Sequence, residues 1–287
     1  MQEAKDQTNE QLKAQQRKNL LYGGLSNEIA GPVNVILNAA EILKKHIEGR
    51  QELQEAVWAI EDNIRLLDRL GTNLLDMVGC LSGGNTPFLQ PVDLRGQLCY
   101  LLEQCEPYAR RQGIALHWQA EGMPALYPCC DTVMLDGILL RLLSNAIRFG
   151  RAGGGIWVEV EAGQNGPPAI LVRDDGPGIA PGLLELVFDP LSPREGSGVV
   201  FGCPGMGLYL AREACRAMGW QLRIESGSGG TLARVEMAGR APGPLSPVAL
   251  SSDAIAAHLL CEERQHRVER EMAALFGPLD QDGRKNG

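Results

Sequence analysis

The chain has 287 residues, enough for two ordinary domains that each bury a core. Its composition, with 44% hydrophobic and 22% charged residues, is typical of a soluble globular protein, and a net charge of −8 argues against nonspecific binding to nucleic acid or anionic lipid. No apolar run is long enough for a membrane segment, and the Gln-rich N-terminus lacks a signal-peptide pattern. The eight cysteines show no metal-ligand or C-x-x-C spacing, so we expect reduced thiols and a cytoplasmic location.

The N-terminal part predicts a polar lead-in followed by two helices. Residues 1–20 are polar without an apolar face, and residues 18–47 are compatible with a helix that Pro32 should kink. The next helix carries the clearest periodicity in the chain, with apolar positions every 3.5 residues on average, as in the seam of a helical bundle. These positions are Leu53, Val57, Ile60, Ile64, Leu67, Gly71, Leu74, Val78 and Leu81.

Two such helices make a hairpin with too little core to stand alone. Dimerisation into a four-helix bundle would bury both seams, so we expect residues 21–82 to form a dimerisation hairpin in a homodimer. The alternative is a hairpin that packs on its own second domain. Residues 83–87, Gly-Gly-Asn-Thr-Pro, read as a linker.

Residues 88–239 change to a mixed α and β pattern. The predicted strands are Phe88–Val92, Ile114–Gln119, Ile156–Ala162, Ala169–Arg173, Gln221–Glu225 and Thr231–Met237. The predicted helices are Arg95–Gln112, Thr132–Phe149, Gly182–Val187 and Met206–Met218. Residues 240–287 begin with a Pro-rich linker. A possible last helix, Ser252–Leu275, has a weak apolar face with Ile255, Leu259, Leu260 and Met272 inward.

Three motifs in the mixed region share a chemical logic. Arg141–Phe149 reads R-L-L-S-N-A-I-R-F, Val172–Ile179 reads V-R-D-D-G-P-G-I, and Gly202–Leu208 reads G-C-P-G-M-G-L. Alone, the first could be an amphipathic helix end, the second any glycine turn, and the third a weak phosphate-binding helix start.

Together, in this order, the motifs resemble the three boxes of the ATP-binding fold shared by histidine kinases, gyrase, Hsp90 and the mismatch-repair ATPases. Val187–Pro190 also matches the phenylalanine box of the histidine kinases, and Gly230–Thr231 matches their closing G-T. The resemblance covers residues 19–237. It implies an α+β protein, a helical hairpin followed by an α/β-sandwich ATP-binding domain of the histidine kinase/Hsp90-like type.

The resemblance implies ATP and Mg²⁺ as cofactors. By it, Asn145 would hold Mg²⁺, as suits an oxygen donor for a hard cation, and Asp174 would accept a hydrogen bond from the adenine amino group. Gly176 and Gly178 would let the backbone approach the base. Arg148 stands where the box has Lys and could meet phosphate with a different geometry.

The remaining implied nucleotide residues surround the lid. Gly205 and Gly207 would hinge the lid over the phosphates, and Leu208 and Thr231 complete the glycine box and the closing G-T pair. Phe188 would pack the base of the lid, or serve as an ordinary core aromatic.

The segment Leu25–Asn34 resembles the phosphoacceptor box of sensor histidine kinases, S-H-E-x-x-[T/N]-P-L/V-N, with two departures. Asn27 occupies the place of the phosphoacceptor histidine, and a carboxamide nitrogen is not a useful nucleophile. Glu28, the general base of the family, is retained without an imidazole to serve. Gly31 replaces the residue that positions water for dephosphorylation of a response regulator.

Two further positions bear on the chemistry. Arg141 stands where the kinases have Asn and the related ATPases have a water-activating Glu; a guanidinium cannot act as a general base. We expect it to place a fixed positive charge beside the triphosphate. His46 matches no motif, so we interpret it as a surface histidine, with a substitute phosphoacceptor as the alternative.

These features predict a pseudokinase of the histidine kinase family that binds ATP as an effector, with a response regulator or another kinase as partner. One alternative is an active kinase that phosphorylates a histidine on a partner protein. The other is a dimeric scaffold that does not use nucleotide.

Overall fold

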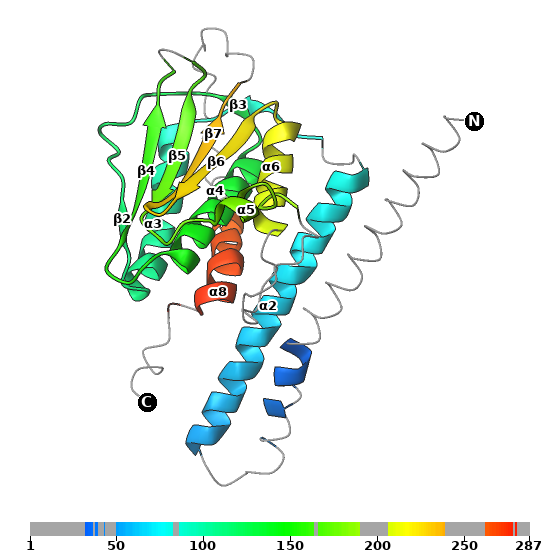
Figure 1. The fold of residues 1–287 in the computed structure, drawn as a ribbon. Helices are drawn as coiled ribbons and strands as arrows, with labels where there is room; N and C mark the ends of the chain where they lie inside the picture. Colours follow the sequence, from blue (N-terminus) through cyan, green and yellow to red (C-terminus); the bar gives the residue numbers. More distant parts are fainter. Residues whose placement is uncertain are drawn as a thin grey trace, which may run out of the picture.

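The structure is a computed structural model, and it describes residues 32–36, 38–39, 43, 50–82, 86–163, 166–189, 206–238, 262–277 and 279. The fold is α+β, with a long helix beside a two-layer α/β unit (Figure 1). Residues 32–36 are helical, so the kink expected at Pro32 falls at the edge of the described residues. No helix among the described residues combines the length and the hydropathy that a membrane span requires.

The long helix is α2, Arg50–Ser82. Its buried residues from the middle onward face the α/β unit: Leu66, Arg69, Leu70, Asn73 and Met77; Ala56, nearer its start, is also buried. On a different side, the heptad positions Val57, Ile64 and Val78 are 43%, 53% and 54% exposed. The helix therefore does pack on its own second domain, as in our alternative, while four of the seven described seam positions, Val57, Ile64, Gly71 and Val78, are exposed.

The main sheet has five strands: β2 (Ala115–His117), β4 (Gly155–Glu161), β5 (Ala169–Asp174), β6 (Gln221–Gly227) and β7 (Gly230–Glu236). Their order is β2-β4-β5-β7-β6, with β2 and β4 parallel and every other pair antiparallel. A separate two-stranded sheet pairs β1 (Gln90–Pro91) with β3 (Cys129–Cys130). Alternate residues of β4 and β5, such as Ile156 and Ile170, are fully buried, because one face of the sheet is covered by helices.

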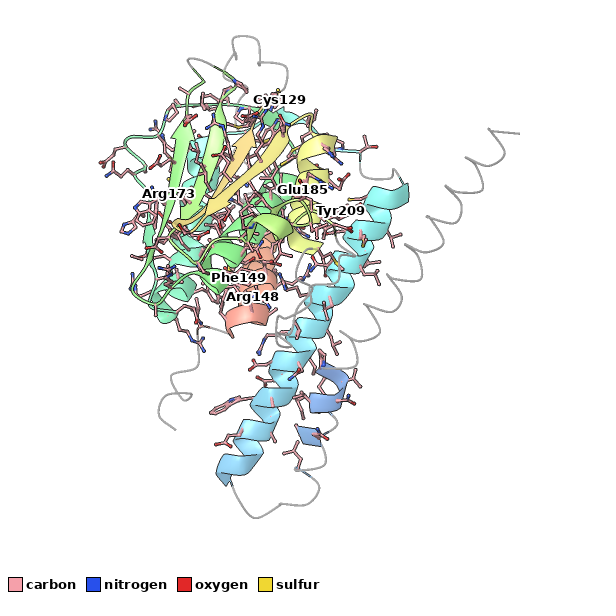
Figure 2. All side chains as sticks on the ribbon, viewed as in Figure 1. Cys129, Arg148, Phe149, Arg173, Glu185 and Tyr209 are labelled. Carbon is pink, nitrogen blue, oxygen red and sulfur yellow. The ribbon has the colours of Figure 1, made fainter. Side chains whose placement is uncertain are left out.

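The covering helices are α3 (Leu94–Arg111), α4 (Thr132–Phe149) and α6 (Met206–Ala217), and a short α5 (Pro181–Leu184) contacts β6. Leu98, Leu102, Leu139 and Leu143 from α3 and α4 are at most 1% exposed and form one core with the sheet. A second, smaller cluster joins Met77 of α2 to Met206 and Leu210 of α6, with Tyr209 packed against it (Figure 2).

The C-terminal segment is helical from residue 262 to Phe276, with a π-helical stretch η1 (Glu269–Ala273) that runs into α8 (Ala274–Phe276). It lies between α2 and α4 (Figure 1). Met272 is fully buried, as expected; Ile255, Leu259 and Leu260 lie outside the described residues.

Most predicted elements are confirmed to within about two residues, and α4 matches at both ends. The differences concern short strands. The predicted first strand shrinks to Gln90–Pro91, and its partner β3 was not predicted, because two cysteines carry no alternating pattern. The six described cysteines are free, and burial raises the pKa of the Cys130 and Cys215 thiols to about 12, which makes them unreactive.

Candidate nucleotide site

Asp174 ends β5, where the neighbouring strands hold it in register with Ile156 and Thr231. Its Oδ1 accepts hydrogen bonds from the backbone N–H of Gly176, at 2.9 Å, and of Thr231, at 3.3 Å. Oδ2 accepts none from the described residues. Burial raises the pKa of this carboxyl and Asp175 adds to the rise, while the two backbone bonds oppose it. One oxygen is thus held by the fold and the other is available to a donor on a ligand.

Asn145 lies near the end of α4. The first turn of this helix is capped by Asp131, whose Oδ1 accepts hydrogen bonds from the backbone N–H of Val133 at 2.9 Å and of Met134 at 3.1 Å. Asn145 is half-buried, and its carboxamide makes no hydrogen bond within the part of the chain that the structure describes. No group of three or more His, Cys, Asp or Glu in that part could hold a metal ion. A cation here would therefore depend on the Asn145 oxygen together with ligand oxygens.

The three motifs meet around α4. A Cβ on Gly176 would lie 2.9 Å from the carbonyl oxygen of Phe149, so the turn after β5 touches the end of that helix. A Cβ on Gly207 would lie 3.9 Å from Cγ of Arg141, so the start of α6 packs on the same helix. Figure 2 shows Arg148 and Phe149 together, with Cζ of Arg148 5.3 Å from the ring centroid. The sequence motifs therefore form one region of the fold.

Gly178 has a packing role in this region. Its φ is +73°, and a Cβ there would lie 1.9 Å from the carbonyl oxygen of Gly227 in the β6–β7 hairpin. The described contacts show that this glycine lets the β6–β7 hairpin approach closely, while its expected role in letting the backbone approach the base stays a prediction. Ser226 ties the same hairpin down, since its Oγ accepts from the N–H of Ile179 at 2.8 Å and lies 3.0 Å from Oγ1 of Thr231.

The lid residues are described only in part. Leu208 and Phe188 are partly buried against the main core. Cζ of Arg212 lies 4.6 Å from the Phe188 ring centroid, and its Nη2 donates to the Phe188 carbonyl oxygen at 3.3 Å, which assigns this aromatic to packing. Gly205 lies outside the described residues, so its expected hinge role remains a prediction.

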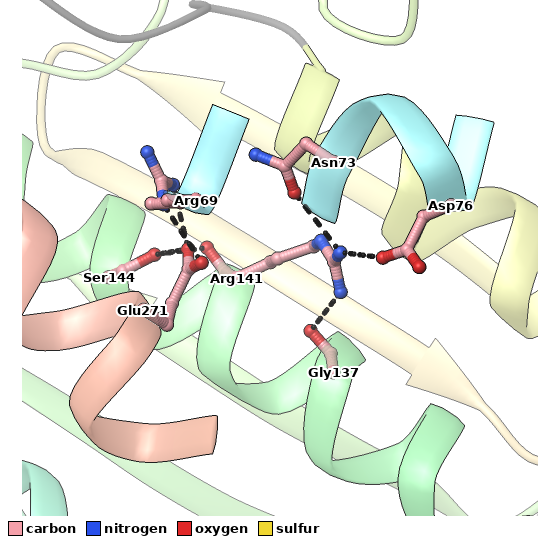
Figure 3. Close-up of polar contacts among 7 residues, drawn as sticks. All are labelled: Arg69, Asn73, Asp76, Gly137, Arg141, Ser144 and Glu271. Atoms are coloured by element: carbon pink, nitrogen blue, oxygen red, sulfur yellow. Dashed lines mark hydrogen bonds and ion pairs between the residues drawn. The ribbon is translucent and has the colours of Figure 1, made fainter. Parts of the chain in front are cut away.

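Arg141 does not point where the sequence suggested. We expected its charge beside the triphosphate, but its Nη2 bonds Oδ2 of Asp76 at 2.7 Å and Oδ1 of Asn73 at 3.3 Å, both on α2 (Figure 3). Its Nη1 donates to the carbonyl oxygen of Gly137 at 3.2 Å. The reason is a carboxylate partner 65 residues away in the chain, which no local pattern reveals. The guanidinium therefore ties α4 to α2.

Of the segment that resembles the phosphoacceptor box, only residues 32–34 are among those that the structure describes. Asn27, Glu28, Gly31 and His46 all lie outside the described residues. Their roles stay predictions from the sequence.

Sequence reasoning missed a set of buried charged residues around α4. Asp136 is fully buried, and Arg69 and Glu271 are 8% and 9% exposed. The available signal was the helical spacing of Arg264, Arg267 and Glu271, which is weak because charged residues at such spacing usually face solvent.

Comparison with known proteins shows which proteins share this sequence pattern and fold. The family profile of histidine kinase-, DNA gyrase B- and HSP90-like ATPases matches residues 130–239. The sensor protein kinase PilS of Pseudomonas aeruginosa is 27% identical over 71% of this chain and 37% of its own length. The sensor protein KdpD of Escherichia coli is 29% identical over 71% of this chain and 22% of its own. The chain thus spans between about a fifth and two fifths of the length of these relatives.

Two solved structures share the fold. The histidine kinase AdeS of Acinetobacter baumannii has a TM-score of 0.59 and 15% identity, covering 74% of this chain and 98% of its own. Full-length ShkA in complex with AMPPNP has a TM-score of 0.57 and 26% identity, covering 79% of this chain and 47% of its own. Both alignments cover more of the chain than the family profile does, so the structural similarity extends beyond residues 130–239.

Proposed function

Because the chain is a member of the sensor histidine kinase family, we propose that it is a two-component signalling protein that binds ATP–Mg²⁺ and does not phosphorylate itself. ATP then acts as an effector, and the output is a change of conformation or of protein contacts. Residues 88–239 are the proposed nucleotide-binding domain, and residues 21–82 the proposed dimerisation hairpin.

The observation that carries nucleotide binding is the state of Asp174. A half-buried carboxylate with one oxygen held by two backbone N–H groups and the other without a described donor suits the amino group of adenine. Asn145 would supply an oxygen to Mg²⁺, and Arg148 would face phosphate. When bound, ATP would supply a triphosphate for the cation to bridge. Thr231 would act indirectly, by orienting Asp174 through its N–H.

The absence of self-phosphorylation rests on two residues. Asn27 has no nucleophilic nitrogen, so the first chemical step of the family has no acceptor at this position. Arg141 cannot activate water, which argues against hydrolysis of the kind that gyrase-like ATPases perform. Its guanidinium is also engaged by Asp76, at 2.7 Å. Glu28 would be a remnant of the ancestral general base.

A second copy of the chain is the first partner that we propose. The exposed positions Val57, Ile64, Gly71 and Val78 of α2 fall seven residues apart, a spacing that a partner helix would cover. A response regulator or another histidine kinase would be the second partner. The free cysteines of the described residues are consistent with the cytoplasmic location that we propose.

Calorimetry of the full chain with ATP–Mg²⁺ tests this proposal. We expect binding without transfer of label to the protein. No binding at millimolar ATP would favour the scaffold instead. Transfer of label to an added histidine-containing protein would favour an active kinase that acts on a partner. The same nucleotide-binding residues could also support that activity.

A further inference from the structure

The C-terminal helical segment lies outside the matched ATPase region, yet it contacts α2, α3 and α4. Residues 262–276 follow the profile match at 130–239 and pack between α2 and α4. Val268, Met272 and Ala273 are at most 7% exposed and belong to the main core. The segment is therefore built into the fold of the domain.

Glu271 joins three elements at one carboxylate. Arg69 of α2 donates to it through Nε at 2.9 Å and Nη2 at 2.7 Å, and Ser144 of α4 donates through Oγ at 2.9 Å (Figure 3). The side chains of Arg69 and Glu271 are 10% and 11% exposed, so this bidentate pair is largely withdrawn from water. Ser144 immediately precedes Asn145, the proposed Mg²⁺ ligand.

Asp136 makes the complementary contact on the other side of the segment. Its carboxylate is fully buried in α4, and its Oδ2 accepts from Nε of Arg264 and Nη2 of Arg267, each at 3.2 Å. Gln97 of α3 donates to its Oδ1. Arg264 also lies over the ring of Tyr100 of α3, with Cζ 4.1 Å from its centroid. The segment thus presents two arginines to the Asp136 carboxylate of α4 and the Glu271 carboxylate to Arg69 of α2.

Removal of the segment would break the Arg69–Glu271 ion pair and would take both arginines from Asp136, which would keep Gln97 as a described partner. Breaking buried ion pairs in this way is strongly unfavourable where the remaining charge stays out of water. An ionic interface nevertheless differs from an apolar one, because its charges regain water when the surfaces separate and part of the loss is recovered. Buried ion pairs therefore suit a contact that closes firmly and can still open.

We propose that residues 262–276 form a C-terminal clamp, which holds α4 of the ATP-binding domain against α2 and must open before the domain can move relative to that helix. Among the described residues, the bonds from Arg141 of α4 to Asp76 and Asn73 of α2 would still tie the two helices when the clamp opens. The clamp goes beyond nucleotide binding and does not depend on it.

Hydrogen exchange of the full chain without nucleotide tests the clamp. In Glu271→Gln, we expect amides of residues 262–276 and of the buried stretch of α2, residues 66–77, to exchange roughly tenfold faster or more. Amides of β4, β5 and β7 should stay unchanged, which shows that the sheet is folded. Glu269→Gln is the matched control, because Glu269 lies on the exposed side of the same helix and contacts only Gln265 and His266 among the described residues.

A second variant guards against a folding defect. Arg69→Met with Glu271→Met replaces the ion pair by apolar side chains of similar length, and we expect exchange in both segments to return to that of the unmodified chain. The clamp is overturned if Glu271→Gln exchanges like Glu269→Gln, or if only residues 262–276 are affected and α2 keeps its protection. It is also overturned if the double variant exchanges as fast as Glu271→Gln.

Discussion

The two carboxylate oxygens of Asp174 have different surroundings, and our proposal gives them different roles. Its Oδ1 is occupied by the backbone of Gly176 and Thr231, and its Oδ2 remains for a ligand. The residue type and its place at a strand end could be predicted, because both follow from the local motif. The division of labour between the two oxygens could not, since it depends on the register of β5 with β7.

This division predicts the effect of Asp174→Asn. The variant keeps an oxygen for the backbone donors and presents an amide donor in place of the free carboxylate oxygen. We expect ATP–Mg²⁺ affinity to fall roughly 10- to 100-fold, equivalent to about 1.5–3 kcal/mol for a hydrogen bond to a charged group, with a small change in Tm. Calorimetry measures the first and thermal denaturation the second.

Asp175→Asn is the matched control for that variant. The Asp175 Oδ1 accepts from the backbone N–H of Gly155 at 3.1 Å, which an Asn oxygen can also do. Nucleotide affinity should be unchanged in this control. Equal affinity of Asp174→Asn and the unmodified chain would contradict the assigned role of Asp174.

Asn27 and Arg141 predict an ordered pair of variants. Asn27→His restores an imidazole next to Glu28, but Arg141 still fixes α4 to Asp76 of α2. We expect no acid-labile label from ATP in Asn27→His and a gain of label when Arg141→Asn is added. Strong labelling of Asn27→His alone would show that Arg141 does not restrain transfer.

At the scale of elements, one face of α2 is buried against the α/β unit and another face is exposed. The face toward the α/β unit buries Leu66, Leu70 and Met77, and the heptad face leaves Ile64 more than half exposed. The 3.5-residue period predicted one helix with an apolar seam, and that could be seen in the sequence. The second buried face includes Arg69 and Asn73, so its polar members concealed it from an apolar pattern.

The exposed seam predicts a dimer that charge would break. Replacing Ile64 and Leu74 with Asp places two carboxylates at the seam, at a cost of several kcal/mol in lost burial and desolvation, about 2–3 for each side chain. Light scattering should find a dimer for the unmodified chain and a monomer for the variant. Asn63→Asp with Thr72→Asp adds the same charge beside the seam and should stay dimeric. A monomeric unmodified chain at high concentration would refute the bundle.

At the scale of the molecule, contacts between distant segments decide how the parts are held. Arg69 and Glu271 are 202 residues apart, and Asp136 and Arg264 are 128 apart. The strands and helices follow from periodicity, capping and glycine turns. These partners could not be predicted, because a charged residue carries no signal of its partner until the fold brings them together.

The buried pair also predicts a pH dependence. Burial alone would raise the pKa of Glu271, but the hydrogen bond and charge of Arg69, with Arg141 and Ser144, hold it below its ordinary 4.5. A lowered folded-state pKa means that Glu271 contributes stability above about pH 4.5, lost as the pH falls through the lower value. The thiol of Cys105 also faces this carboxylate and stays protonated, since burial and Glu271 raise its pKa.

Denaturant unfolding of the unmodified chain and Glu271→Gln measures this contribution. We expect a difference of about 3–5 kcal/mol in the free energy of unfolding at pH 7, narrowing below pH 4.5. Burial raises the pKa of Asp136, against the charges of Arg264 and Arg267. The contribution of Asp136 to the free energy of unfolding therefore changes with pH in the opposite direction to that of Glu271. Because the unmodified chain and Glu271→Gln both contain Asp136, its contribution cancels in the difference between their free energies of unfolding. A difference independent of pH would contradict the charged pair.

The central claim is that this chain binds ATP–Mg²⁺ and does not phosphorylate itself, and one labelling measurement tests it most directly. The full chain is incubated with γ-labelled ATP and Mg²⁺ at a concentration that saturates binding by calorimetry, and acid-labile label on the protein is followed over time. We predict saturable binding and no label, because Asn27 offers no nucleophile. Stable incorporation of label into the unmodified chain, mapped to any histidine, would contradict the account.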